Sequence, residues 1–277
     1  MALKSTISST LVSQPIVITA ITAEDLYNYL YWDYRIYDLR SSQDYAKCHI
    51  HTAHHIDPST ATTVSAIACL DAQITADYGR AEQAERVIIC TDGTEDHSET
   101  LSLLQAYLNS PVNPSSTLLR NIHFLTGGHA NFESKFPFLC NDFIHFNECI
   151  QLAWPSYIQP NLYLGSALCR NQTVVSMLGI THIMSFSDYP EKKLQFENAT
   201  EWISNAIEND KGTVLVHCEQ GVSRSPTIII AYLLGYSKND AKQFTTVNEA
   251  LQRLRFISKL IMPSGIVYDY ANARCST

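Results

Sequence analysis

Short apolar segments alternate with helix-like stretches through the first half of the chain. Residues 34–39 (YRIYDL), 87–90 (VIIC) and 121–125 (NIHFL) are rich in β-branched and aromatic residues and end at polar or glycine-containing turns, which is typical of strands. A capping pattern at Thr22 (TAED) and the spacing of apolar residues over 101–108 predict two helices. Strands that alternate with helices indicate a parallel α/β sheet.

The second half repeats this organisation. Residues 161–165 (NLYLG), 180–186 (ITHIMSF) and 213–217 (TVLVH) predict strands. The proline-containing residues 154–160 between the halves predict a boundary. The chain is therefore expected to contain two separate α/β units.

Three stretches of the second half carry helical spacing, at residues 194–207, 225–234 and 240–256. Residues 225–234 contain a run of three isoleucines that would also suit a strand. The Ser-Pro start of this segment and the stop at Gly235 favour a buried helix. The predicted fold class is α/β, with two three-layer α/β domains.

Composition narrows the class of protein. The chain has 277 residues, 45% of them hydrophobic, and a net charge of -8 with scattered basic residues, which argues against a nucleic-acid or membrane-surface binder. No apolar run reaches membrane-spanning length, and residues 1–14 do not resemble a signal peptide. Eight cysteines without a CxxC pair predict reduced thiols and a cytoplasmic location, with the nucleus as an alternative.

Residues 214–226 (VLVHCEQGVSRSP) place a cysteine between a predicted strand and a predicted helix. A loop folded onto a helix N-terminus directs backbone N–H groups inward and binds anions. Cleavage of a phosphate ester by a thiol needs such a nest, a thiolate and a compensating positive charge. Cys218 is the candidate nucleophile. The candidate phosphate-binding loop is Glu219, Gln220, Gly221, Val222, Ser223 and Arg224.

Each distinctive residue of this segment has a chemical reason. Gly221 lets the loop turn without a Cβ clash, and Arg224 can form two parallel hydrogen bonds to phosphate oxygens. The same positive field should lower the pKa of the Cys218 thiol. Ser225 can donate a hydrogen bond to the sulfur and ease its departure from a phosphoenzyme. We expect His217 to support the loop, since a thiolate needs no base.

The loop HCEQGVSRSPT resembles the signature loop of the dual-specificity branch of the protein tyrosine phosphatase superfamily, and residues 158–184 resemble that family's opening strands. The resemblance implies hydrolysis of phosphotyrosine, and of phosphothreonine or phosphoserine, through a cysteinyl-phosphate and without a cofactor. It also implies an aspartate, about thirty residues before the cysteine, that acts as general acid. Asp188 occupies that place as the predicted catalytic acid, with Glu191 as a fallback.

The chain departs from the family between the strand GITHI and the acid loop. A further strand normally lies there, whereas Ile183 is followed almost at once by Asp188. We expect either a sheet with one strand fewer or a rearranged segment. The loop also offers Glu219 and Gln220 in place of the lysine typical of phosphoinositide phosphatases, which favours a phosphoprotein substrate.

The first half resembles a rhodanese-like domain through residues 38–40, 49–53 and 124–132. In active rhodaneses a cysteine opens the loop after the central strand, and Cys90 occupies that place. Residues 91–98 are acidic and lack an arginine, so they would repel anionic sulfur substrates. We therefore expect a non-catalytic module, with sulfur transfer through Cys90 as the weakest alternative.

The predicted domains are residues 15–145, rhodanese-like and non-catalytic, and residues 153–277, a dual-specificity phosphatase catalytic domain. This order resembles the MAP kinase phosphatases, which dock kinases through a basic cluster in the N-terminal module. Here the arginines of the first half are isolated: Arg35, Arg40, Arg80 and Arg86. A MAP kinase partner is therefore a hypothesis that rests on the resemblance.

Four histidines raise the alternative of a metal site: His49, His51, His54 and His55. Their spacing fits no known structural zinc site and only Cys48 adjoins them, so we predict that the protein needs no metal. Cys140 or Cys169 could trap Cys218 as a disulfide under oxidation, and the sequence favours neither.

The leading interpretation is an enzyme that acts on a phosphorylated protein and binds neither nucleic acid nor membrane. The alternative is a phosphoprotein-binding adaptor in which the anion nest is intact and hydrolysis is impaired by the short acid-loop region. A third interpretation makes Cys218 a buried core residue at the end of a strand.

Overall fold

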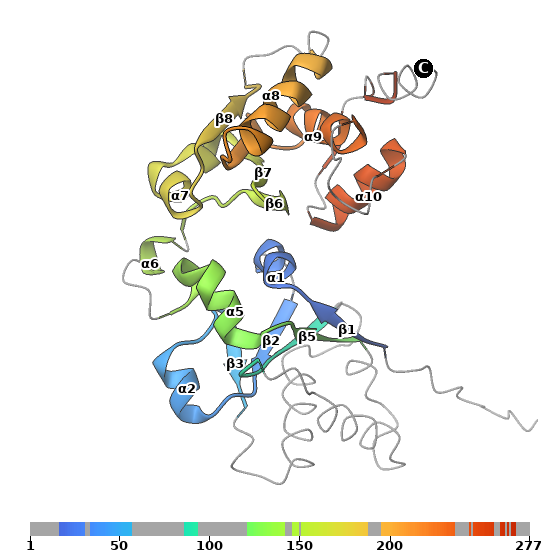
Figure 1. Ribbon diagram of the computed structural model, residues 1–277. Helices are drawn as coiled ribbons and strands as arrows, with labels where there is room; N and C mark the ends of the chain where they lie inside the picture. The colour runs from blue at the N-terminus through green and yellow to red at the C-terminus, as the bar shows by residue number, and fades with distance from the viewer. Residues whose placement is uncertain are drawn as a thin grey trace, which may run out of the picture. The chain divides into compact units, whose positions relative to one another are not determined.

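The computed structural model divides the chain into two units, which Figure 1 shows in ribbon form. Residues 1–23 and 32–135 form the first unit, and residues 24–31 and 136–277 form the second. No helix in the described part of the chain is long and apolar enough to cross a membrane. The structure describes residues 17–30, 34–56, 86–93, 121–141, 146–149, 151–187, 195–235, 244, 246–257, 261–263, 265 and 267–269.

Several features predicted from the sequence lie outside these described residues. They are the helix at 101–108, the acidic residues 94–98, Arg80, Asp188 and Glu191.

The first unit is built on a sheet whose described strands are all parallel. Its central strand carries the run Val87, Ile88, Ile89 and Cys90, of which none is more than 1% exposed. A parallel strand covered on both faces needs such a continuous apolar run, and this run made the strand predictable. The order is β1 (Val17–Ile21), β5 (Asn121–Leu125), β4 (Arg86–Cys90), β2 (Tyr34–Asp38) and β3 (Ala53–His55).

Two helices of the first unit carry little apolar periodicity. Helix α2 (Ser42–Lys47) begins where the sequence suggested only a polar break, and that part of the prediction was wrong. Its N-cap Ser41 accepts a hydrogen bond from the backbone N–H of Asp44 at 3.1 Å, and it has no buried residue. Capping rather than an apolar face therefore specifies this helix. Helix α5 (Gly128–Lys135) follows the Gly127-Gly128 turn.

The second unit contains a four-stranded sheet in the order β6 (Ser156–Gln159), β7 (Leu162–Ser166), β9 (Val214–Cys218) and β8 (His182–Ser185). Strand β6 is antiparallel to β7, and the other neighbours are parallel. Residues 154–160 were predicted as a boundary, although the family resemblance placed the opening strands from residue 158, inside β6. Prolines at both ends of this segment hid the strand, and they are compatible with its edge position.

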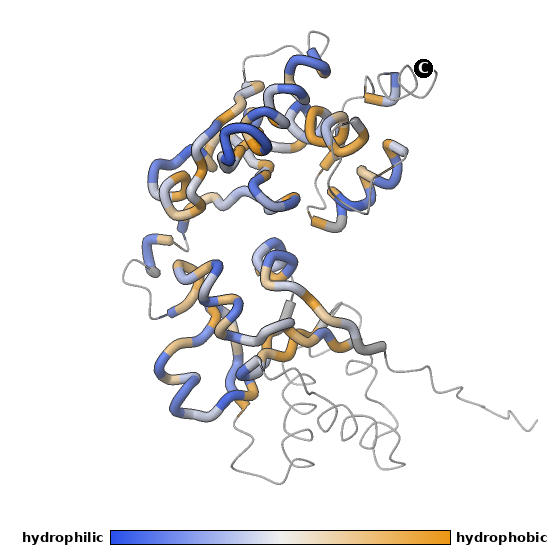
Figure 2. The backbone as a smooth tube through the Cα atoms, in the orientation of Figure 1, coloured by the Kyte–Doolittle hydropathy of each residue, from blue (hydrophilic) through white to orange (hydrophobic). Residues whose placement is uncertain are grey.

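Three helices share one hydrophobic core with this sheet: α8 (Phe196–Glu208), α9 (Arg224–Gly235) and α10 (Val247–Ile257). Helix α9 is buried on all sides from Ser225 to Leu233, and Figure 2 shows hydrophobic colour along it, with mixed colours on α8 and α10. Helix α10 begins later than predicted. Thr246 and Glu249 exchange two backbone-to-side-chain hydrogen bonds of 3.2 Å, and this capping box fixes the start.

Helix α1, which the Thr22 pattern predicted, belongs to the second unit. Its Tyr27 donates a hydrogen bond to the Pro155 carbonyl at 2.6 Å. Asn28 exchanges two hydrogen bonds of 2.8 Å with the backbone of Tyr157. Its side-chain amide thereby pairs with a backbone N–H and a carbonyl at the edge of β6. The shorter elements are α1 (Ala23–Tyr29), η3 (Pro137–Leu139), α6 (Phe146–Cys149), η4 (Ala167–Arg170) and α7 (Gln172–Met177).

Candidate active site

Cys218 ends strand β9 at the carboxyl edge of the second sheet. Its side chain is 2% exposed. The sulfur accepts a hydrogen bond from Ser225 Oγ at 3.2 Å and another from the backbone N–H of Gly221 at 3.3 Å. Both donors point at the sulfur, and a sulfur that accepts two hydrogen bonds is favoured as a thiolate.

The ionisation of Cys218 follows from these contacts. Burial by itself would raise the pKa of the thiol. Hydrogen bonds from the Ser225 side chain and from the backbone N–H groups of Ser225, Gly221 and Ser223 oppose this effect, and the pKa of Cys218 lies below its ordinary value. The loop therefore stabilises the nucleophilic form of the sulfur.

The backbone of the loop after Cys218 is held from outside. The carbonyl of Glu219 accepts a hydrogen bond from Ala167 N–H at 3.1 Å, and the carbonyl of Val222 accepts one from Met262 N–H at 2.9 Å. In a planar trans peptide the carbonyl and the following N–H point in opposite directions. Fixing these carbonyls outward therefore turns the next N–H groups inward, toward the place of an anion.

Two further contacts complete this support. Thr227 donates a side-chain hydrogen bond of 2.8 Å to the Ser223 carbonyl, and Phe186 N–H donates one of 2.8 Å to the His217 carbonyl. The sequence did not predict the supporting residues Ala167, Met262 and Thr227. Two of them act through backbone N–H groups, which leave no signal in the sequence.

Gly221 is required by both conformation and space. Its φ of 73° lies in the left-handed region, where a side chain is strained. A Cβ at this position would lie 2.8 Å from the carbonyl carbon and oxygen of Gly165 on β7. The loop can therefore approach the neighbouring strand only because this residue is glycine.

Arg224 is the first residue of α9, beside the positive end of the helix dipole. Its guanidinium donates a hydrogen bond to the carbonyl of Ser187, so the chain enters the predicted acid loop next to this arginine. Asp188, the following residue, lies outside the described part of the chain, and its role as general acid stays a prediction.

His217 is buried on β9, one residue before the nucleophile. Its Nδ1 lies 3.3 Å from the carbonyl oxygen of Cys218. Burial lowers the pKa of this imidazole, although the Cys218 carbonyl acts in the opposite direction. A neutral ring that contacts the loop backbone is compatible with a supporting role.

Cys90 occupies the corresponding strand end in the first unit. It is fully buried, and its sulfur donates a hydrogen bond to the carbonyl of Thr91 at 3.8 Å. The nearby Arg40 forms an ion pair of 2.7 Å with Asp38 and donates to the carbonyl of Cys48 at 2.6 Å. Arg40 is therefore committed to internal contacts.

Two of the four histidines considered from the sequence have ring nitrogens within hydrogen-bond distance of backbone carbonyls. His49 Nδ1 lies 2.9 Å from the Tyr45 carbonyl and His55 Nε2 lies 3.0 Å from the Arg40 carbonyl. Burial and the neighbouring His49 lower the pKa of His51. The rings of His49 and His55 also both stack on Tyr45, with centroid distances of 4.0 and 4.6 Å.

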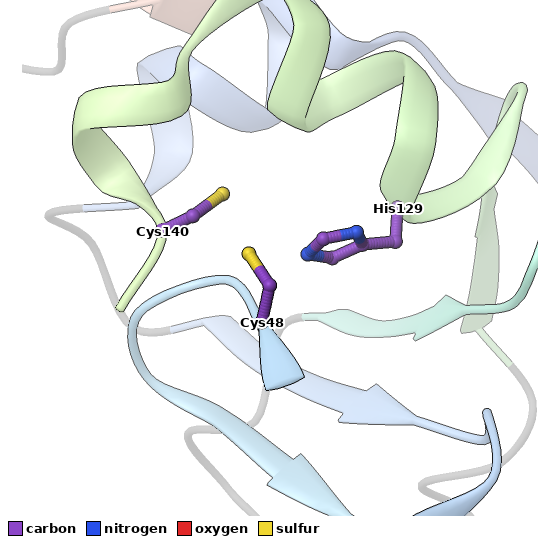
Figure 3. A group of neighbouring side chains, drawn as sticks. All are labelled: Cys48, His129 and Cys140. Atoms are coloured by element: carbon purple, nitrogen blue, oxygen red, sulfur yellow. The ribbon is translucent and has the colours of Figure 1, made fainter. Parts of the chain in front are cut away.

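Figure 3 draws as sticks three side chains of the donor types that zinc prefers: Cys48, His129 and Cys140. Cys48 and His129 belong to the first unit and Cys140 to the second. Within the first unit, His129 Nδ1 lies 3.4 Å from the carboxylate of Glu133. Each unit by itself supplies at most two of these three residues. Protein zinc sites use at least three protein ligands.

The two cysteines considered as redox partners of Cys218 lie in different surroundings. Cys169 is buried with its sulfur 3.8 Å from Ser166 Oγ, and burial raises the pKa of its thiol despite that hydrogen bond. Cys140 donates a hydrogen bond to the Phe136 carbonyl at 4.0 Å. The choice between them stays open.

Two family models match the chain, one in each half. Residues 22–135 match the rhodanese-like domain, and residues 186–268 match the catalytic domain of dual specificity phosphatases. The chain combines a rhodanese-like domain with a dual specificity phosphatase domain. This result confirms the resemblance found in the sequence, including the order of the domains, whereas the predicted limits of 15–145 and 153–277 stay predictions.

Individual relatives agree with these matches. Dual specificity protein phosphatase 8 from Mus musculus is 27% identical over 249 residues, which cover 76% of this chain and 37% of the relative. Dual specificity protein phosphatase 26 from Mus musculus is 30% identical over 125 residues, which cover 35% of this chain and 56% of the relative. The chain thus spans between about a third and somewhat over half of these relatives.

Solved structures include a leucine rich repeat and phosphatase domain containing protein from Entamoeba histolytica. It is 21% identical, with a TM-score of 0.38, over 44% of this chain and 93% of that chain.

Proposed function

We propose that this protein is a dual-specificity protein phosphatase that hydrolyses phosphotyrosine, and phosphothreonine or phosphoserine, through a cysteinyl-phosphate on Cys218. The supporting observation is the sulfur of Cys218, which accepts hydrogen bonds from Ser225 and Gly221 and has a lowered pKa at the N-terminus of α9. A thiolate within an anion nest is the arrangement that phosphate transfer to sulfur requires.

In the first step the Cys218 thiolate attacks phosphorus, and the bond from phosphorus to the leaving oxygen breaks. The phosphate oxygens are bound by the inward N–H groups of the loop and by Arg224. A guanidinium has five N–H donors, so a bidentate contact to phosphate is compatible with its hydrogen bond to Ser187. Asp188 is the proposed donor of the proton that the leaving oxygen takes up.

In the second step water attacks the cysteinyl-phosphate, and the bond between sulfur and phosphorus breaks. The Asp188 carboxylate, left without its proton by the first step, accepts one from this water. Ser225 Oγ, 3.2 Å from the sulfur, donates to the thiolate as it leaves. Phosphate departs and the enzyme returns to its starting state.

The proposed substrate is a phosphorylated protein, and we propose a MAP kinase within that class because the domain order resembles that of the MAP kinase phosphatases. We also propose a cytoplasmic location, on the cysteine usage of the sequence. The internal ion pair of Arg40 removes one of the arginines that could dock such a partner.

The purified chain should turn over an aryl phosphate and a peptide phosphorylated on both tyrosine and threonine, and Cys218→Ser should abolish both activities. The alternative is a phosphoprotein-binding adaptor, for which the short segment before Asp188 is the motivating observation. Phosphopeptide binding by the wild-type chain without any turnover would favour the adaptor. Capture of a phosphorylated MAP kinase from cell extract by Cys218→Ser tests the proposed substrate.

A further inference from the structure

Strand β8 lies at the edge of the second sheet, where it pairs with β9 on one side and with no described strand on the other. Only every second residue of β8 takes part in this pairing. The N–H groups of His182 and Phe186 donate to carbonyls on the side of β9, at 3.0 and 2.8 Å. Because the backbone groups of successive strand residues point to opposite sides, the N–H and carbonyl groups of Ile183 and Ser185 lie along the outer edge.

This outer edge carries no device that would block it. Ile183 and Ser185 are exposed, and within the described ranges no backbone group donates to or accepts from their N–H and carbonyl groups. The strand sequence HIMS contains no lysine or proline, the residues with which proteins commonly protect an exposed edge. An unprotected row of backbone donors and acceptors is a template for a further extended segment.

Exposed apolar side chains flank the edge on both faces of the sheet. Ile183 is 41% exposed, and Trp202 on α8 is 37% exposed. Trp202 contacts His182 on β8, with ring centroids 5.7 Å apart. Side chains alternate along a strand, so His182 faces α8 with Trp202, whereas Ile183 points to the opposite face. A strand added to β8 therefore covers an apolar side chain on each face.

The edge leads to the phosphate-binding loop. Strands β8 and β9 are parallel and paired from His182 to Ser185, so both end at the same side of the sheet as Cys218. Two residues after β8, the carbonyl of Ser187 accepts a hydrogen bond from the Arg224 guanidinium. Neighbouring strands lie about 4.8 Å apart, so a segment laid along β8 lies within a few residues of the place of the phosphate.

The length of the edge indicates the kind of partner. The four residues of β8 offer a ladder of roughly 13 Å, at about 3.3 Å per residue. Such a short contact suits the transient encounter of an enzyme with its substrate, whereas a permanent dimer buries a much larger surface. Together with the position of Arg224 next to the end of β8, this favours the substrate over a second copy of the chain.

We propose that the outer edge of β8 binds an extended segment of the phosphoprotein substrate, close in sequence to the phosphoresidue, as a further strand of the sheet. The inference rests on the proposed phosphatase function and adds a docking site for the substrate main chain. The backbone groups of Ile183 and Ser185 bind the segment, and its alternating side chains contact Ile183 on one face and Trp202 on the other. The substrate that fits best has β-branched or aromatic residues in this segment, since these favour a strand.

The test uses phosphotyrosine peptides with an arm of valine, isoleucine, valine and threonine, separated from the phosphotyrosine by a spacer of about three residues, or about 10 Å. The arm precedes the phosphotyrosine in one peptide and follows it in another, because an added strand can run in either direction. Each peptide has a partner in which the arm nitrogens are methylated, which removes the main-chain donors and keeps every side chain. For at least one arm position, the unmethylated peptide should have a kcat/KM about 10-fold higher, the scale of two net hydrogen bonds.

A variant of the edge tests the same contact from the side of the protein. Ile183→Pro removes an outward N–H and leaves the groups that pair with β9, and proline is tolerated on an edge strand. It should lose most of the preference for the unmethylated arm and turn over an aryl phosphate at the wild-type rate. Tyr268→Ser, which removes a side chain of similar exposure, 38%, is the matched control and should keep the preference. If Ile183→Pro fails to fold, the two forms of the peptide still test the edge on the wild-type protein.

Amide hydrogen exchange of Cys218→Ser, followed by NMR, observes the edge without turnover. The Ile183 and Ser185 amides should exchange rapidly in the free protein and become protected when the unmethylated peptide binds. Protection of both amides in the free protein would show that the edge is already covered, and would overturn the docking site. Equal kcat/KM for both forms of the peptide, together with a dimer that Ile183→Pro dissociates in sedimentation, would assign the edge to a second copy instead.

Failure of the docking site and failure of the proposed function give different results. Equal kcat/KM for the methylated and unmethylated peptides, with an active aryl phosphatase, would overturn the docking site and leave the proposed function intact. Peptide-induced protection of the Ile183 and Ser185 amides, without any turnover by the wild-type protein, would support the docking site and overturn the phosphatase. Absence of both turnover and protection would overturn both.

Discussion

The two units of this protein each end a buried central strand with a cysteine, and the hydrogen bonds that the structure records at the two sulfurs run in opposite directions. Cys90 on β4 and Cys218 on β9 are equally buried, at 0% and 2% exposure. The Cys90 sulfur donates a hydrogen bond to the Thr91 carbonyl, whereas the Cys218 sulfur accepts from Ser225 and Gly221. The two cysteines share their position at a strand end and their burial, and they differ in whether the sulfur donates or accepts its recorded hydrogen bonds.

The helix N-terminus that reaches each of these strand ends also differs: it belongs to α5, which follows β5, in the first unit, and to α9, which follows β9 itself, in the second. In the first unit the His129 N–H, in the first turn of α5, donates to the Thr91 carbonyl at 3.0 Å. In the second unit the first turn of α9 brings Arg224 and Ser225 to the loop. A helix N-terminus binds an anion only where its donors remain directed at the site, and in the first unit the loop carbonyl takes up this donor.

The largest expected effect separates the two cysteines directly. Cys218→Ser should lower kcat for an aryl phosphate by roughly 10⁴-fold or more, because loss of a covalent nucleophile removes the reaction path. Cys90→Ser should leave kcat and KM unchanged. Steady-state kinetics of the two variants, with thermal melting to verify folding, checks the comparison. Loss of activity in Cys90→Ser with an unaltered melting temperature would contradict it.

A second prediction concerns Asp188, the proposed general acid of the second unit. Asp188→Asn should slow turnover by roughly 10²- to 10⁴-fold, the contribution of a general acid. The slowing should be smaller for an aryl phosphate with a good leaving group than for a phosphothreonine peptide, since a good leaving group needs less protonation. An unchanged rate and pH profile would exclude Asp188, and Glu191→Gln would then be measured.

Ser225→Ala sharpens the comparison by removing one of the two donors recorded at the Cys218 sulfur. Its hydrogen bond lowers the pKa of Cys218, so its loss should raise that pKa. The thiolate then forms at higher pH, and the acid limb of the kcat/KM profile moves to higher pH. A hydrogen bond to a charged group contributes about 1.5–3 kcal/mol, so kcat/KM on the acid limb should fall by about 10-fold or more. The pH dependence of alkylation by iodoacetate measures the thiolate independently, and an unshifted alkylation profile would refute this role.

The last prediction concerns the free energy of unfolding more than catalysis, at the glycine that closes the loop. Gly221 and Gly179 both have positive φ, at 73° and 61°, but only Gly221 has atoms within contact distance of an added Cβ. Gly179→Ala should cost about 1 kcal/mol of unfolding free energy for its backbone conformation. Gly221→Ala should cost about 2 kcal/mol more and also reduce activity. Urea denaturation of both variants measures the difference, and equal costs would show that the approach to Gly165 is unimportant.

The sequence by itself determined the buried strands and the chemistry of the loop. The runs at 87–90 and 213–217 are apolar because both faces of these strands are covered. The residue types of the loop are restricted by phosphate chemistry. Both families of domain could be identified from such local patterns, and the family models confirm them.

Elements without a local signal needed the tertiary structure. Helix α2 has no buried face, β6 lies between prolines, and the loop is held by backbone N–H groups of Ala167 and Met262. These contacts join residues about 40 to 50 positions apart and involve no characteristic side chain. The direction of hydrogen bonds at Cys90 and Cys218 was likewise decided in three dimensions, because two cysteines at equivalent strand ends differ only in what the rest of the chain brings to them.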